Sequence, residues 1–134
     1  MTATALAVRR VAAPRTTAIL AGLLALGVLV EAALAGGFLG GSHTWKSWHE
    51  NLGTFLILIP VASLLVGLAL YRRQPENVLM LASRVVLLLL AVSVVVTGNA
   101  GGNLLAVHIP AAVAMVGLVV SQAMIATQVR GAER

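Results

Sequence analysis

The sequence contains no cysteine, and only 10% of its residues are charged and 4% are aromatic. The lack of cysteine excludes disulfide bonds, thiolate metal sites and thiol catalysis. The low charge is far from the composition of soluble domains, in which about a quarter of the residues are charged. There are no paired carboxylates, no Ser-His-acid arrangement and no glycine-rich phosphate loop after a strand. With no catalytic motif present, we do not expect a hydrolase or a phosphoryl-transfer enzyme.

What the sequence has in abundance is apolar residues, which make up 60% of the chain. They gather in four runs, roughly 17–38, 48–71, 78–97 and 104–127. Each run is about 20 residues long, the length of α-helix that crosses a hydrocarbon core of about 30 Å. The four runs and the short connections between them use nearly all of the chain and leave no room for a separate soluble domain. We therefore predict an all-α fold in which residues 1–134 form one domain, a transmembrane antiparallel four-helix bundle.

The basic residues predict how the four spans are oriented. Arginine occurs in the N-terminal tail, between the second and third runs and in the C-terminal tail, at Arg9, Arg10, Arg15, Arg72, Arg73, Arg130 and Arg134. The opposite side carries only Lys46. Since short loops rich in Lys and Arg stay in the cytoplasm, we expect both termini to be cytoplasmic and the protein to lie in a bacterial inner membrane. The basic residues have no interleaved aromatic residues, so they do not predict binding of nucleic acid.

The N-terminal run also has features of a secretory signal peptide, because basic residues precede it and Ala33-Leu34-Ala35 imitates a cleavage site. The run is long for a signal peptide, and Glu31 lies unusually close to the cleavage site. We interpret the run as a true first span.

All three histidines, His43, His49 and His108, lie at the outer side of the predicted bundle. Ionisable residues at membrane depth are expensive and usually functional. The second and fourth spans of such a bundle are diagonal neighbours, with axes about 11–14 Å apart. Imidazoles that reach inward from these two spans would bracket one metal centre, and neutral imidazole nitrogen is a favoured ligand of haem iron. We predict His49 and His108 as the axial ligands of one haem b.

Two other residues have a predicted role around this site. Glu31 lies in the outer third of the first run, where its carboxylate can accept a hydrogen bond from a ligand histidine and orient the ring. His43 lies in a Gly-Ser loop and is expected to be exposed to solvent. An alternative is an outward-facing zinc or copper site formed by His43, His49 and His108, since imidazole suits both metals.

Two residues inside the runs predict local structure. Arg84 lies about two turns inside the inner boundary of the third run, and we expect its long side chain to extend outward to the membrane interface. Pro60 lies in the middle of the second run, where its missing N–H should leave the Leu56 carbonyl unbonded and kink the helix.

Short motifs in three of the runs resemble those of a bacterial family of small four-span membrane proteins of unknown function. Segment 30–38, with Glu31 ahead of an Ala-Gly pair, resembles that family's first span, although the family commonly has glutamine there. The sequence His-Glu-Asn-Leu-Gly from His49 resembles its His-x-x-Leu-Gly motif. His108 begins a version of its His-Pro-x-x-Ala motif in which Pro110 is displaced by one residue.

The same layout is similar to half of a haem A synthase and to cytochrome b561-like bundles, which hold haem between histidines near the ends of diagonal helices. The second histidine pair of cytochrome b561 is absent, so the resemblance implies at most one haem. The expected function is electron transfer, with quinol as a candidate partner. The alternative is a cofactor-free accessory subunit that packs against a larger membrane complex or forms a homo-oligomer.

Overall fold

The computed structural model describes residues 15–73 and 78–131. Its helices are α1 (Arg15–Leu39), α2 (His43–Leu56), α3 (Leu58–Arg73), α4 (Val78–Ala100) and α5 (Leu105–Gly131), with a short 3-10 turn, η2 (Gly102–Leu104), before α5. Four stretches are long and apolar enough to cross a membrane, with α2 and α3 together forming the second. The protein is therefore an integral membrane protein with four candidate spans, and the predicted antiparallel all-α bundle is confirmed. The predicted basic residues of the tails before residue 15 and after residue 131 lie outside the described residues.

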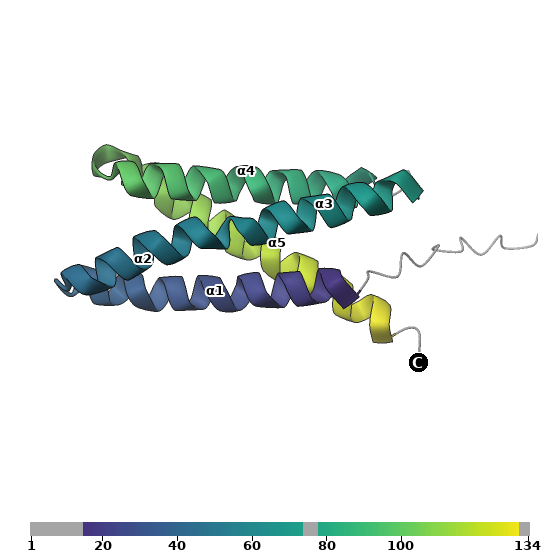
Figure 1. Cartoon of the computed structure of the whole chain (residues 1–134), viewed down its shortest axis with the longest axis horizontal. Helices are drawn as coiled ribbons and strands as arrows, with labels where there is room; N and C mark the ends of the chain where they lie inside the picture. Colours follow the sequence, from purple (N-terminus) through teal and green to yellow (C-terminus); the bar gives the residue numbers. More distant parts are fainter. Residues whose placement is uncertain (1–14, 74–77, 132–134) are drawn as a thin grey trace, which may run out of the picture.

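The second and fourth spans cross the bundle in opposite directions (Figure 1). α2 packs mainly against α1, whereas its continuation α3 packs mainly against α4. α5 contacts both α4 and α1, and Figure 1 shows it leaving the side of α4 and crossing toward α1. In the described part of the chain, the backbone of α5 does not come close to that of α2 or α3, and the backbone of α1 does not come close to that of α4. The predicted diagonal relation between the second and fourth spans is confirmed.

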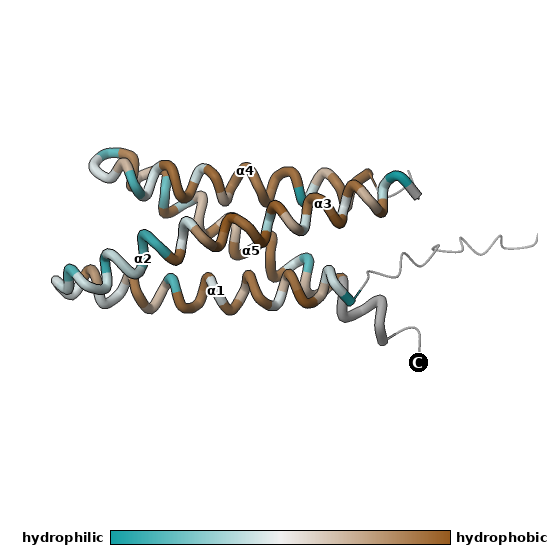
Figure 2. The backbone as a smooth tube through the Cα atoms, in the orientation of Figure 1, coloured by the Kyte–Doolittle hydropathy of each residue, from teal (hydrophilic) through white to brown (hydrophobic). Residues whose placement is uncertain are grey.

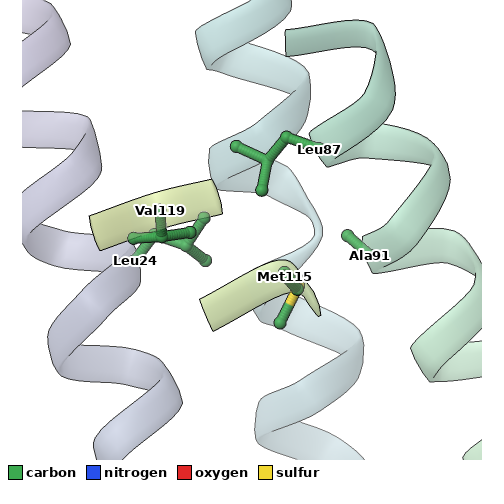
Figure 3. Packing of buried hydrophobic residues seen from close by; sticks show 5 residues of the cluster. All are labelled: Leu24, Leu87, Ala91, Met115 and Val119. Atoms are coloured by element: carbon green, nitrogen blue, oxygen red, sulfur yellow. The ribbon is translucent and has the colours of Figure 1, made fainter. Parts of the chain in front are cut away.

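The core lies where these spans cross. It is formed by Leu24 of α1, Leu87 and Ala91 of α4, and Met115 and Val119 of α5 (Figure 3). Lipid is as apolar as these side chains, so their association depends on close van der Waals packing rather than on escape from water. Small residues such as Ala91 help because they let neighbouring helices approach closely.

Burial is unevenly distributed along the bundle. We call the end with the turns at 40–42 and 101 the histidine end, and the end near Arg15 and Arg72 the arginine end. In the described residues, α2 has no buried residue, and neither 92–100 of α4 nor 105–114 of α5 has one. Among the residues whose burial the structure describes, every buried side chain lies in the middle of the bundle or toward the arginine end. The four spans are therefore packed tightly at one end and loosely at the other.

The second span is broken in its middle, as Pro60 predicts. The helix is interrupted at Ile57, between the end of α2 and the start of α3. Proline has no backbone N–H, so the carbonyl of Leu56 lacks the donor that would continue the α-helical ladder. Val61 resumes the ladder with a hydrogen bond of 3.2 Å from its N–H to the carbonyl of Ile57. The break separates the loosely packed α2 from α3, in which Pro60 is fully buried.

The helix of the second span begins earlier in the sequence than predicted. α2 starts at His43 rather than at residue 48, because the Ser42 side chain caps the helix by accepting a hydrogen bond from the Trp45 N–H. The turn before it needs glycine at Gly41, whose φ is +96°. Figure 2 shows hydrophilic residues concentrated in α2 and hydrophobic residues over most of the other helices. His49 therefore lies almost two turns inside a helix rather than at its start.

Candidate functional site

The first part of the site is a pair between neighbouring spans. Nδ1 of His49 on α2 lies against Oε2 of Glu31 on α1. The two side chains are only 26% and 13% exposed, so the pair is largely removed from solvent. Glu31 therefore lies beside His49, and its role toward a ligand histidine stays a prediction. Gly53, one turn after His49, faces the carboxylate, and a Cβ atom there would stand 3.7 Å from both Glu31 oxygens.

The second part of the site joins the other two spans. Nδ1 of His108 on α5 lies 2.8 Å from the backbone carbonyl oxygen of Val94 on α4. The ring rests on Gly98, one turn further along α4, where a Cβ atom would come within 2.8 Å of ring atom Cε1 and 2.9 Å of Nδ1. Real Cβ atoms essentially never approach other atoms this closely, so glycine is needed for this contact.

The two parts meet between the diagonal spans. The rings of His49 and His108 are 6.4 Å apart between centroids, with an interplanar angle of 80°. The backbones of α2 and α5 do not come close to each other in the described residues, so this ring contact links the two helical hairpins at the histidine end through side chains. Glu31, His49, His108 and the Val94 carbonyl thus form one polar series that passes through all four spans.

This polar series is incompletely satisfied. The contact between His49 and Glu31 is close but lacks the geometry of a hydrogen bond, so Oε1 of Glu31 and Nδ1 of His49 are buried without a hydrogen-bond partner among the described residues. An unsatisfied buried polar atom usually costs about 1–3 kcal/mol. The described residues of α2, 92–100 and 105–114, which surround the site, include no buried side chain. The histidine end thus has polar groups to offer and little core of its own.

His43 does not join the other two histidines in the structure. It is the first residue of α2 rather than a loop residue, and it is exposed as predicted. Among the residues that the structure describes, no group of three or more His, Asp or Glu side chains is arranged to hold a metal ion. Nearby on α2, Lys46 pairs with Glu50 at the exposed surface. The arrangement that remains is a pair of imidazoles.

The prediction for Arg84 was wrong. Its side chain is 1% exposed and turns into the bundle instead of extending to the interface. Nη1 donates a hydrogen bond of 2.7 Å to the carbonyl of Ser63, and Nη2 donates one of 2.9 Å to Oγ1 of Thr17. Gly67 makes room for the side chain, since a Cβ atom there would stand 2.6 Å from Cδ of Arg84. These partners supply the acceptors that the interface would otherwise have supplied.

The sequence did not predict the polar cluster around Arg84, which joins the helices at the arginine end. Arg84 of α4 joins Thr17 of α1 to Ser63 of α3, and Nε2 of Gln122 on α5 donates a hydrogen bond of 3.2 Å to Oγ of Ser83 on α4. The available signal was a serine followed by a glycine one turn later in the second span. Ser63 provides a backbone carbonyl and Gly67 leaves the neighbouring helix surface without a side chain, but neither residue indicates that Arg84 is the partner.

Comparison of the chain with protein-family models, with curated proteins and with solved structures gives no match. The class of the protein therefore follows from its fold alone, as a four-span integral membrane protein.

Proposed function

We propose that the protein binds one haem b at its histidine end and transfers electrons within the membrane. The observation that carries the proposal is the pairing of His49 and His108 from diagonal spans, with ring centroids 6.4 Å apart. The contact brings two imidazole side chains, which are favoured nitrogen ligands of haem iron, together from opposite corners of the bundle. When bound, haem supplies a one-electron redox couple.

The residues around the rings fit this role. The Nδ1 atoms of His49 and His108 face Glu31 and the Val94 carbonyl, respectively. Ligating histidines almost always direct their second ring nitrogen to a carboxylate or carbonyl, which orients the ring and raises its basicity. Both Nε2 atoms then remain for ligation. A site with two protein ligands suits haem iron, whose remaining ligands come from the macrocycle.

The loose packing of the histidine end is also consistent with a bound group. A flat macrocycle requires space between the hairpins, and no described residue of α2, of 92–100 or of 105–114 is buried there. The apolar side chains of these segments would cover the faces of the macrocycle. Quinol is the candidate electron donor or acceptor, because it shares the membrane with the site.

The visible spectrum of the detergent-purified protein tests the proposal. Protein from haem-replete cells should show a low-spin Soret band, because two imidazoles give a strong axial field. His49→Ala and His108→Ala should each abolish the low-spin spectrum, whereas His43→Ala, a change at an exposed residue, should leave it unchanged.

Two results would contradict the proposal. Equal loss of the spectrum in His43→Ala would favour the three-histidine metal site instead. A colourless wild-type protein would favour the accessory subunit, in which the two histidines only join the hairpins.

A further inference from the structure

The two imidazoles of the site are held in different ways. His108 lies on α5, which is helical on both sides of its internal Pro110 and contributes Met115 and Val119 to the core. His49 lies on α2, which has no buried residue and is separated from α3 by the break at Ile57. The helix that carries His108 therefore continues into the core of the bundle, whereas the helix that carries His49 packs against α1 and ends at Leu56, before the break in the second span.

The partner of the His108 ring also restricts that ring more than the partner of the His49 ring does. The carbonyl oxygen of Val94 can only accept, so the hydrogen bond of 2.8 Å requires a proton on Nδ1 of His108. In the neutral ring Nε2 is then the free lone pair, which is the form that binds a metal. The carboxyl group beside His49 can accept or donate, so it does not restrict His49 to one tautomer.

Gly98 maintains the arrangement of His108. Its missing side chain allows the ring to lie against α4, with Nδ1 directed at Val94 one turn earlier. Any larger residue at position 98 would overlap the ring, because its Cβ atom would be within 2.9 Å of Nδ1. Gly98 therefore allows the ring to lie where the Val94 carbonyl can accept from Nδ1, and that hydrogen bond fixes the tautomer.

We propose that His108 is the fixed ligand of the metal centre and His49 the exchangeable one, with Gly98 as the positioning residue of His108. The proposal rests on the proposed function, since it assigns unequal roles to the two haem ligands. The coordination position on the α2 side is then a binding site for small neutral molecules with a lone pair, such as imidazole or carbon monoxide. When such a molecule replaces His49, α2 moves aside. The rest of the bundle stays in place, because the helix is interrupted at Ile57 between α2 and α3.

Hemin titration of purified variants tests whether the two histidines have unequal roles as ligands. His49→Ala should bind hemin through His108 as a high-spin species that becomes low-spin when imidazole is added. His108→Ala should bind hemin about tenfold or more weakly than His49→Ala. Reduced wild-type protein should bind carbon monoxide with displacement of His49. Equal loss of hemin in the two histidine variants, or the reverse order, would overturn the proposal.

Gly98→Ala tests the positioning role, with Gly117→Ala on α5 as its matched control because nothing lies within 4 Å of a Cβ atom there. Gly98→Ala should weaken hemin binding about 10–100-fold, and Gly117→Ala should not change it. Thermal unfolding of both variants separates a local effect from a failure to fold. Unchanged hemin affinity in a folded Gly98→Ala protein would exclude the positioning role.

The ¹⁵N NMR shifts of His108 in haem-free wild-type protein give a readout that does not depend on hemin. They should report the Nδ1–H tautomer. The Nε2–H tautomer would overturn the fixed-ligand assignment even if hemin binds. Failure of wild-type protein to bind hemin, with the Nδ1–H tautomer present, would instead contradict the proposed function while leaving the role of Gly98 intact.

Discussion

At the scale of single residues, the ionisable side chains inside the spans are held by specific partners. Arg84 donates to Ser63 and Thr17, and Glu31 lies against His49. An ionisable group in the bilayer interior is costly, and partners within the bundle reduce that cost. Both clusters join residues from different spans, so each specifies how the helices come together, and the Arg84 cluster also provides hydrogen-bond acceptors for a buried guanidinium.

Glu31 is predicted to tune the site rather than to ligate the metal. A carboxylate near the iron stabilises the oxidised state, so Glu31→Gln should retain haem and raise its midpoint potential by an amount on the order of tens of millivolts, where 59 mV equals a tenfold change for one electron. Potentiometric titration of the Soret band measures the shift. Glu50→Gln is the control, because Glu50 pairs with Lys46 at the surface. An unchanged potential in Glu31→Gln would leave Glu31 without a tuning role.

At the scale of helices, several close approaches depend on a glycine that receives a side chain from the next helix along the chain. Leu56 lies over Gly27, Trp45 over Gly37, Arg84 over Gly67 and His108 over Gly98. Small residues at helix interfaces are the usual means of close packing in membranes. Together these contacts join each span to the one that follows it in the sequence.

Gly67→Ala is predicted to loosen α3 from α4. The added Cβ atom would stand 2.6 Å from Cδ of Arg84, and relieving the overlap should cost about 1–3 kcal/mol of unfolding free energy. Gly22→Ala on α1 is the matched control, since its Cβ atom meets nothing within 4 Å and it should stabilise the protein by about 0.4–1 kcal/mol. Thermal unfolding in detergent compares the two. Equal stability of both variants would show that Arg84 does not need the space at Gly67.

At the scale of the whole molecule, the number of spans and their diagonal order were predictable from the sequence because hydropathy and loop length determine both. The break near Pro60 was predictable from the missing N–H. The burial of Arg84 was not, since its acceptors, Ser63 and Thr17, lie on two other spans and only the crossing of the helices brings them close. For the same reason, the hydrogen bond from His108 to the Val94 carbonyl could not be predicted from the sequence.

The orientation of the molecule in the membrane is a prediction of the basic residues. A reporter that is active only in the cytoplasm should give full signal when fused before Met1 or after Arg134, because the short segments rich in arginine stay on that side. Fusion of the same reporter within the turn at 40–42 is the control and should give none. Full signal after Arg134 from a reporter that works only outside the cytoplasm would reverse the orientation.

The polar contacts between spans also have a consequence for the order of biosynthesis. Thr17 and Ser63 precede Arg84 in the chain, Glu31 precedes His49, Val94 precedes His108 and Ser83 precedes Gln122. Each newly inserted span that carries one of these nitrogen-bearing side chains therefore enters a bilayer that already holds its oxygen partner. An arginine at the centre of a lone helix raises the cost of insertion by about 2.5–3.5 kcal/mol. Because both acceptors of Arg84 are translated before it, the third span need not carry an unpartnered guanidinium while the fourth is being made.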